Sequence, residues 1–283
     1  MYINQAQPKK YFKERLNKFR IEKMNKLLNF LTLVFLISVP SYISAHDLMA
    51  AVQSEDRSTK NIERDQYRNP TETLSFFEIK PNMIVVELSP GGGWYTEILA
   101  NYLHEPGMLI AAHFDKDSEV GYFKRGRENF EKKIASSPMY SNVEIVDLSS
   151  NLAKEGSVDA VITFRNLHNW LGPQMDSIFA NSFKALRPGG IFGVVEHRAN
   201  PGTSMEEMKK SGYVTEEHAI KVAKKHGFTL VSTSEINANN KDTKNHPKGV
   251  WTLPPNLRLK DVEKEKYIAI GESDRMTLLF KKL

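Results

Sequence analysis

The 283-residue sequence contains no cysteine. This absence excludes disulfide bonds, thiol catalysis and cysteine-ligated zinc, and it suits a protein exported to an oxidising compartment. The eight histidines show neither a His-x-x-x-His nor a His-Glu-x-x-His spacing, in which two imidazoles on one helix can bind zinc together. We therefore predict that the protein binds no metal.

An apolar run long enough to span a bilayer is also missing. Such a span needs about 20 residues, whereas the longest run covers residues 27–39. A run of that length, preceded by Lys23 and Lys26, is typical of a signal peptide, and the small residue Ala45 offers a cleavage point. We predict a leader over residues 1–45 and export of the rest, with membrane contact only through this leader.

Two alternatives concern the same segment. An uncleaved leader would anchor the protein to the membrane. Met24 begins a leader of ordinary size, so residues 1–23 would then be an upstream extension from a misassigned start codon. The sequence does not indicate an oligomeric state.

A strong positive charge is absent from the body of the chain. The formal net charge is +5, but residues 1–45 hold eight Lys and Arg against two Glu, so the remainder is close to neutral. A nearly neutral domain lacks the electrostatic footprint of a nucleic-acid-binding protein, and we predict no nucleic-acid partner. With 40% hydrophobic residues in the chain, residues 46–283 are expected to form a single domain with a sizeable core.

Short apolar runs alternate with helical patterns from residue 83 onward, which indicates a parallel sheet with crossover helices. The expected strands cover residues 83–88, 108–114, 143–147, 158–164, 191–196, 228–235 and 276–281. The expected helices cover residues 94–103, 173–186 and 215–226, and a turn is expected at residues 187–190. Residues 236–275 separate the last two strands, and a connection of that length often covers a functional site as a lid.

The first expected strand runs through Val85 into three glycines and an amphipathic helix. Glycines let backbone N–H groups approach a ligand closely, and the start of a helix offers unpaired donors and partial positive charge. A dinucleotide-binding fingerprint would require a further glycine where Thr96 stands. A phosphate-binding P-loop would require Gly-Lys-Ser/Thr, but Gly93 is followed by Trp94 and Tyr95. The pattern that remains is an acidic residue at the end of a strand followed by Gly-x-Gly.

This pattern, with Glu87, Gly91 and Gly93, resembles the first motif of the class I S-adenosylmethionine-dependent methyltransferases. Asp115, which closes the second strand, resembles the family's acidic residue on the ribose hydroxyls, and Asp147 resembles the residue that contacts the adenine amino group. The resemblance implies an α/β fold: a doubly wound, mostly parallel seven-stranded sheet with a C-terminal antiparallel strand. It also implies S-adenosyl-L-methionine as the cofactor.

The resemblance covers about residues 60–283, including the turn at residues 187–190 before the fifth strand. More narrowly, residues 90–99 and 248–255 resemble a group of uncharacterised bacterial predicted methyltransferases with an N-terminal leader. The chain departs from the family at Ser89, where a glycine is usual. It also lacks, after the fourth strand, the polar-Pro-Pro-aromatic motif of the methylases that act on nucleic-acid amino groups, so a small-molecule acceptor is expected.

Polar residues cluster after two adjacent strands. His168 follows the expected fourth strand, and Glu196 and His197 end the fifth. Because ligands of such sheets bind outside the carboxyl ends of the strands, near the switch point, these clusters are expected to meet beside the cofactor. We predict His168, Glu196 and His197 as candidate general bases and Arg165 as a cofactor-binding residue. The alternative is structural: Glu196 and His197 anchor a loop by hydrogen bonds, and His168 packs on Trp170.

The leading hypothesis is a methyltransferase that acts on a small molecule. A second hypothesis is an exported ligand-binding protein that keeps the methyltransferase fold without turnover. It arises because the lysines before the apolar run favour export of the domain, whereas S-adenosylmethionine is made in the cytoplasm. A nicotinamide-dependent oxidoreductase is disfavoured by Thr96.

Overall fold

The computed structural model describes residues 48–283, so the predicted leader lies outside the described residues. The strands are β1 (Ile84–Leu88), β2 (Met108–His113), β3 (Val143–Asp147), β4 (Val158–Phe164), β5 (Leu186–His197), β6 (Phe228–Ser234), β7 (Pro247–Val250) and β8 (Arg275–Lys282). The longer helices are α5 (Trp94–Tyr102), α6 (Gly121–Ala135), α8 (Pro173–Ala185) and α10 (Glu216–Lys225). The shorter ones are α3 (Thr59–Ile62), η1 (Asp65–Tyr67), α4 (Pro70–Phe76), η2 (Pro138–Tyr140), α7 (Leu167–Trp170), α9 (Met205–Ser211) and α11 (Lys264–Ile270).

Seven of the strands form one sheet in the order β3-β2-β1-β4-β5-β8-β6. The pairs from β3 to β5 are parallel, and β8 is antiparallel to both β5 and β6. This arrangement confirms the predicted fold class. The chain builds outward from β1 to β3 and then returns to place β4 on the other side of β1. The strand order therefore reverses between β1 and β4, which is where a doubly wound sheet binds its ligands.

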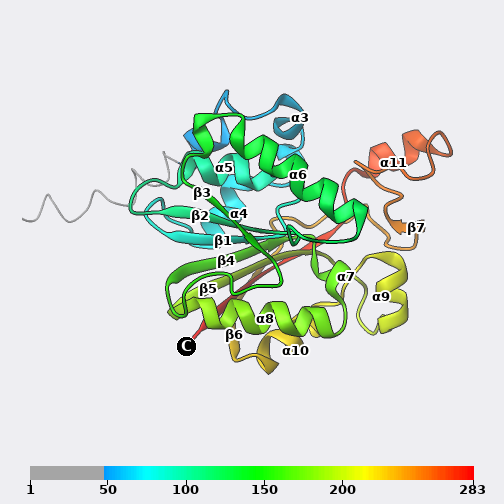
Figure 1. Ribbon diagram of the computed structural model, residues 1–283. Coiled ribbons are helices and arrows are strands. Elements are labelled where there is room, and N and C mark those ends of the chain that lie inside the picture. Colours follow the sequence, from blue (N-terminus) through cyan, green and yellow to red (C-terminus); the bar gives the residue numbers. More distant parts are fainter. Residues whose placement is uncertain (1–47) are drawn as a thin grey trace, which may run out of the picture. The chain divides into compact units, whose positions relative to one another are not determined.

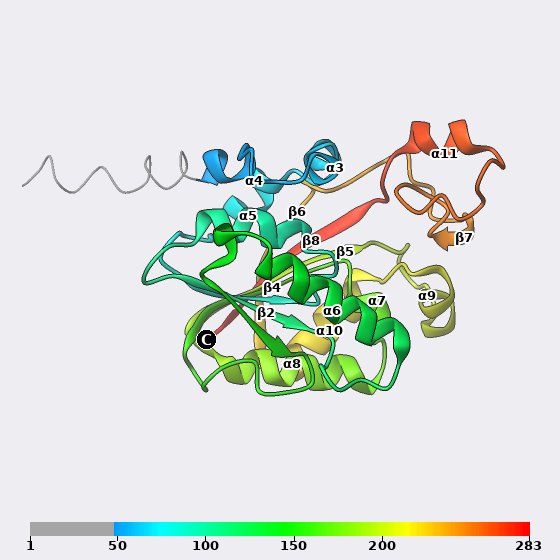
Figure 2. The ribbon, with the colours of Figure 1, turned by 45° about the horizontal axis from the view of Figure 1, so that its top comes forward.

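Helices cover both faces of the sheet, with α4, α5 and α6 on one face and α8 and α10 on the other (Figure 1, Figure 2). Alternate residues of β1 serve the two resulting cores. Val86 and Leu88 pack in the same buried cluster as Phe179 of α8, whereas Val85 packs in the same cluster as Ile98 of α5. A strand buried on both faces reads as a continuous apolar run, which is why the sequence revealed it.

The predicted helices over residues 94–103, 173–186 and 215–226 are confirmed to within a residue as α5, α8 and α10. The turn expected at residues 187–190 is corrected: β5 already begins at Leu186, which pairs with Val158 of β4. Regular pairing resumes only where Ile191 meets Ala160, so the Arg-Pro-Gly-Gly segment forms an irregularity within the strand.

The connection between β6 and β8 contains β7 and α11; the buried Asn237 ties it to α4 and β8, and Asn239 ties its first residues to its last. Asn237 Nδ2 donates to Thr73 Oγ1 and to Thr277 Oγ1, both at 3.0 Å. Asn239 Nδ2 donates to the backbone oxygens of Ile270 and Glu272. No helix in the described part of the chain is long and apolar enough to cross a membrane.

Candidate functional site

A cavity of about 660 Å³ opens at the carboxyl ends of the parallel strands; we call it the switch-point cavity. Its volume lies within the range of roughly 300–1,000 Å³ found for small-molecule sites. Its walls are formed by Ser89, Gly91, His113, Phe114, Asp115, Ser118, Tyr122, Phe123, Leu148, Ser149, Asn166, Asn169, Trp170, Gln174, Ser177, Ile178 and Asn181. The loops after β1, β2, β3 and β4 therefore all reach it.

The glycine loop after β1 forms one wall of this cavity in left-handed backbone conformations. Ser89, Gly91 and Gly93 have φ angles of 49°, 59° and 77°. A Cβ added at Gly91 would meet no atom within 4 Å, so this glycine borders open space. A Cβ at Gly93 would lie 3.2 Å from Phe130 and from Lys133. Gly93 therefore permits the close approach of α6, whereas Gly91 borders the cavity.

Ser89 stands at the position where the family usually has a glycine, and it carries an unpaired polar group. Its Oγ is buried and has no hydrogen-bond partner among residues 48–283. Residues other than glycine seldom adopt a positive φ, and those that do concentrate at functional sites. Ser89 lines the switch-point cavity, but its hydroxyl oxygen is covered by the surrounding atoms and does not face that cavity.

The two predicted aspartates lie in different surroundings. Asp115 lines the cavity and accepts the backbone N–H of Ser149 through Oδ1 at 3.1 Å. Its Oδ2 has no hydrogen-bond partner within residues 48–283 and can accept from a ligand. Asp147 is paired with Arg127 at 2.7 Å and accepts the backbone N–H of Lys116. Asp147 thus supports the loop that carries Asp115 and is not part of the cavity wall.

Glu87 lies behind the glycine loop. Its side chain is 2% exposed and accepts a hydrogen bond of 2.6 Å from Thr96 Oγ1 of α5. Burial raises the pKa of Glu87 to about 7, although the Thr96 hydrogen bond acts in the opposite direction. Glu87 therefore ties β1 to α5 and supports the loop from below.

Sequence reasoning missed His113, which lines the cavity beside the glycine loop. Its Nδ1 accepts the backbone N–H of Phe114 at 2.8 Å, so its Nε2 carries the proton and donates to Gly91 O at 3.2 Å. The ring also stacks on Phe130 at 4.7 Å. Burial lowers the pKa of His113, which favours this neutral form. Its place two residues before Asp115 is the signal that could have found it.

The segment of residues 165–170 after β4 borders two cavities. Asn166 and Asn169 line the switch-point cavity. Arg165 and His168 line a second cavity of about 250 Å³, which we call the arginine cavity. Its remaining walls are formed by Arg64, Arg68, His197, Val250, Trp251, Pro254, Pro255, Asn256, Glu272 and Arg275. The structure therefore separates Arg165 from Gly91 and Asp115, with which the sequence had grouped it.

Backbone geometry fixes this segment at the switch point. Arg165 has a φ of 62°, and its backbone N–H donates to Val195 O of β5 at 2.7 Å. Asn166 Nδ2 donates to Leu88 O and Ser89 O at the end of β1, each at 3.2 Å. The ends of β1, β4 and β5 are thus held together, and strained residues stand at the ends of β1 and β4.

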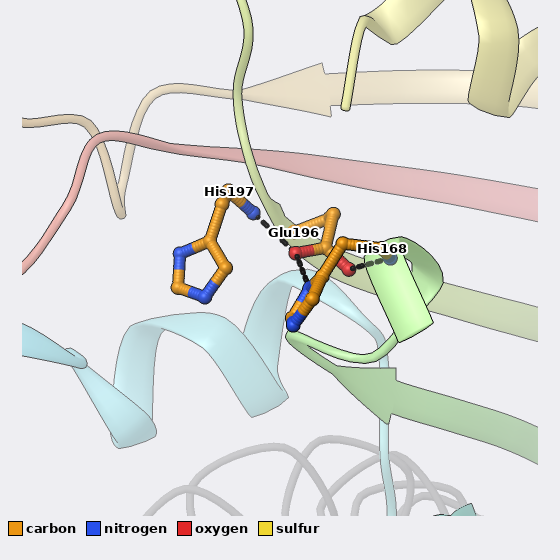
Figure 3. A group of neighbouring side chains, drawn as sticks. All are labelled: His168, Glu196 and His197. Carbon is orange, nitrogen blue, oxygen red and sulfur yellow. Dashed lines mark hydrogen bonds and ion pairs between the residues drawn. The ribbon is translucent and has the colours of Figure 1, made fainter. Parts of the chain in front are cut away.

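The two polar clusters meet (Figure 3), but they do so at the arginine cavity: His168, Glu196 and His197 do not line the switch-point cavity, beside which they were expected. Glu196 is fully buried, and its Oε1 lies 3.1 Å from His168 Nδ1. The same carboxylate accepts the backbone N–H groups of His168 at 3.3 Å and His197 at 2.7 Å. His197 Nδ1 lies 2.5 Å from Ser273 Oγ. Glu196 thus anchors the loop, as the structural alternative required, and also orients the His168 ring.

Each of the two histidines uses Nδ1 for a hydrogen bond within this group. With Nδ1 directed at the Glu196 carboxylate, His168 is left with Nε2 in the arginine cavity, where it can accept a proton. Burial lowers the pKa of His197 well below its usual range, and His168 and nearby arginines lower it further. His197 is therefore neutral near pH 7. His168 packs against His197 and Trp251, with ring centroids 5.2 and 6.0 Å away.

His168, Glu196 and His197 also have the residue types of a metal site, with possible ligand atoms within 4.8 Å of one another. No spacing in the sequence indicated this group, because the fold brings together residues from α7 and β5. The Glu196 oxygens already accept hydrogen bonds from both neighbours, which favours the orienting role. The absence of a metal stays a prediction.

No protein-family model and no curated protein matches the sequence. The fold matches solved structures over most of the chain. A SAM-dependent methyltransferase from Aquifex aeolicus is 13% identical with a TM-score of 0.53, covering 83% of this chain and 98% of that one. Geranyl diphosphate C-methyltransferase from Streptomyces coelicolor A3(2), bound to Mg²⁺, geranyl diphosphate and S-adenosyl-L-homocysteine, is 11% identical with a TM-score of 0.54, covering 83% and 88%.

The [4+2]-cyclase SpnF is also similar, at 13% identity and a TM-score of 0.56, covering 85% of this chain and 94% of that one. At these identities the matches show the fold. The chain has the fold of the class I S-adenosylmethionine-dependent methyltransferases. The cyclase shows that a similar fold also carries a different reaction, so function must be argued from the site.

Proposed function

We propose that the protein is an S-adenosylmethionine-dependent methyltransferase that acts on a small-molecule acceptor. The observation that carries the proposal is the switch-point cavity, in a sheet of the methyltransferase fold, with Gly91 and Asp115 in its wall. A cavity at this position in this topology is where the sequence motif places the cofactor.

The cavity wall suits S-adenosylmethionine chemically. The free Oδ2 of Asp115 can accept a hydrogen bond from a ribose hydroxyl. Gly91 leaves room for close approach of the ligand to the backbone. The aromatic rings of Phe114, Tyr122 and Phe123 give an apolar surface to a base.

When bound, S-adenosylmethionine supplies a methyl group on a positively charged sulfur. Transfer of this methyl group to a nucleophilic atom of the acceptor would leave neutral S-adenosylhomocysteine. The protein's part is to position the acceptor and to take any proton it releases. His168 Nε2, oriented through Nδ1 by Glu196, is suited to take that proton.

Calorimetric titration of the full-length protein with S-adenosylmethionine and S-adenosylhomocysteine tests this proposal. We expect both to bind, and we expect Asp115→Ala to weaken binding by about 1.5–3 kcal/mol, or tenfold or more, through loss of a charged hydrogen bond. Asp117→Ala is the matched control, because Asp117 is exposed and lies outside the cavity wall. Failure of the folded protein to bind either compound would contradict the proposal.

The alternative of an exported ligand-binding protein rests on the predicted leader and on the cyclase among the similar structures. The two functions differ in turnover. A methyltransferase forms S-adenosylhomocysteine when a suitable acceptor is present, whereas a binding protein holds its ligand unchanged. An acceptor screen that measures S-adenosylhomocysteine discriminates them once binding is established.

A further inference from the structure

The arginine cavity has a charge imbalance that the rest of the fold does not explain. Four arginines and one glutamate line it, together with His168 and His197. Burying a cation without a partner is costly, so clusters of like charge in a semi-enclosed space are normally paired. The pairing in this cavity is incomplete, as the contacts of Glu272 show.

Glu272 is 4% exposed and already serves three of the four arginines. Its carboxylate pairs with Arg64 at 2.6 Å, with Arg68 at 3.3 Å, and with Arg275. Burial alone would raise the pKa of Glu272, but Arg275, Arg68 and Arg165 lower it to about 2. The carboxylate is therefore fully ionised and has no capacity left for a further partner.

Arg165 is the unpaired member. Its guanidinium makes no hydrogen bond and no ion pair with any residue of the described chain. Burial, reinforced by the nearby charge of Arg275, lowers the pKa of Arg165 to about 10, which leaves it a cation near pH 7. Ion pairs with Glu272 give Arg64, Arg68 and Arg275 a structural role. Arg165 has no such ion pair in the described chain, so a structural role does not explain it.

The cluster is held in place before any ligand arrives. Arg275 Nη1 donates to Tyr67 O at 2.8 Å, and its Nε is buried without a partner in the described chain. The Arg68 guanidinium lies over the ring of Trp94, 4.6 Å from its centroid. Donors fixed in this way lose little freedom on binding, which favours affinity for a complementary anion.

We propose that the arginine cavity binds an anionic group of the methyl acceptor, a carboxylate or a phosphate, on Arg165 with Arg68 and Arg275. Guanidinium groups match both oxyanions by paired N–H donors. That the bound molecule is the methyl acceptor rests on the proposed function, whereas the presence of an anion site does not. The cavity also exposes His168, so an acceptor held by its anion would lie beside the proposed proton acceptor.

The size of the cavity limits the acceptor. At about 250 Å³ it is smaller than the roughly 300 Å³ at the lower end of sites for drug-sized ligands. Residues 165–170 border both cavities, so an acceptor whose anion lies in the arginine cavity must extend past this segment to bring its reacting atom to the switch-point cavity. We therefore expect the anionic end of the acceptor to be a small carboxylic acid or phosphate ester group.

The test is calorimetric titration of the full-length protein with inorganic phosphate and, separately, with acetate, at low salt and without cofactor. We expect at least one of them to bind wild type, and Arg165→Asn to weaken that binding by about tenfold or more. Asparagine is chosen because it tolerates the positive φ of this position. The anion that binds more tightly identifies the acceptor as phosphate or carboxylate.

Arg187→Asn is the matched control, because it removes an arginine that is half exposed and paired with Asp159 outside the cavity. It should leave anion affinity within about twofold of wild type, since exposed charges contribute little. Arg165→Lys keeps the charge and should retain part of the binding even if the Asn variant folds poorly. If wild type binds neither anion, or if Arg165→Asn binds as well as wild type, the inference is overturned.

Titration of Arg165→Asn with S-adenosylmethionine separates this inference from the proposed function. We expect cofactor affinity within about twofold of wild type, because Arg165 lines the arginine cavity and not the switch-point cavity. A loss of cofactor affinity would return Arg165 to the cofactor site and overturn the inference. If wild type binds anions but not S-adenosylmethionine, the anion site stands and the proposed function fails.

Discussion

At the scale of single residues, acidic side chains with similar sequence signals have different environments. Asp115 has a free carboxylate oxygen at the switch-point cavity, whereas Glu87 is buried against Thr96 and Asp147 is paired with Arg127. Within its motif, Glu87 therefore holds the glycine loop in position and does not itself face the switch-point cavity. Its buried carboxylate has a consequence for stability that does not depend on any ligand.

Glu87 should make stability depend on pH. Its folded-state pKa of about 7 lies above the ordinary 4.5, so the stability it contributes is fully present below pH 4.5 and is lost as pH rises through about 7. Replacing it by glutamine keeps the neutral form at every pH. The free energy of unfolding of Glu87→Gln, relative to that of wild type, should therefore rise by up to about 3 kcal/mol from pH 5 to pH 8.

Urea unfolding at pH 5 and pH 8 measures this difference. Glu217→Gln is the control, because Glu217 is exposed on α10 and should show no such gain. If the difference in free energy of unfolding between Glu87→Gln and wild type is the same at pH 5 and pH 8, the pKa of Glu87 is not raised.

His168 and Glu196 should act as one unit in turnover. His168→Gln should lower kcat by about 10²–10⁴-fold, the range for loss of a general base. Glu196→Gln should lower kcat less and leave KM nearly unchanged, because Glu196 only orients the ring. Their double variant should be no slower than His168→Gln, since residues that act together are non-additive.

The measurement is acceptor-dependent formation of S-adenosylhomocysteine, with His104→Gln as a control at an exposed histidine. A double variant that loses the product of the two single effects would show that Glu196 and His168 act independently.

At the scale of elements, α5 links the glycine loop to the arginine cavity. The residues that follow Gly93 are buried against the N-terminal helices. Trp94 Nε1 donates to Asn61 O at 2.8 Å, and Tyr95 Oη donates to Arg68 O at 3.3 Å. The same motif that borders the switch-point cavity therefore positions Arg68, a role that its sequence does not signal.

Trp94→Phe should loosen this connection. The substitution keeps an aromatic ring but removes the indole N–H, so Asn61 O keeps only backbone donors, among them the N–H of Arg64, and the loss should cost about 0.5–1.5 kcal/mol. Hydrogen exchange should become faster for the amides of residues 57–68 and stay unchanged in α8, on the opposite face of the sheet (Figure 1). Uniformly faster exchange would instead indicate a general loss of core packing.

Much of the sheet could be predicted because its strands are short apolar runs buried on both faces. The helix α6 could not, since only Arg127 and Phe130 of its residues are buried and the apolar stripe is too thin to read. Because α6 was not predicted, the contribution of its Phe123 to the wall of the switch-point cavity was not predicted either. The irregular start of β5 was taken for a turn because proline and glycine signal both.

The site divides in the same way. Gly91 and Asp115 were found because their signals are local: a glycine loop and the end of a strand. The arginine cavity was not, because Glu272 lies 208 positions from Arg64, and only the long connection before β8 brings them together. Pairing over such distances depends on tertiary packing, which leaves no periodic trace in the sequence.

At the scale of the whole molecule, the proposed activity and the predicted leader make opposite demands. The positive charge of the chain is concentrated in residues 1–45, as expected of an export signal, and residues 46–283 are nearly neutral. A methyltransferase needs a donor that is made in the cytoplasm. Whether the leader is cleaved and the domain exported therefore decides whether the protein meets S-adenosylmethionine.

Mass spectrometry of the N-terminal peptide, on protein recovered separately from the cytoplasmic and exported fractions of a bacterial host, decides this point. We expect His46 as the first residue in the exported fraction, because the apolar run and Ala45 match a cleavable signal. Protein found only in the cytoplasm with its N-terminus intact would remove the export prediction and place the domain with its donor. Cleaved protein outside would require an external source of donor, and in its absence would favour a bound ligand without turnover.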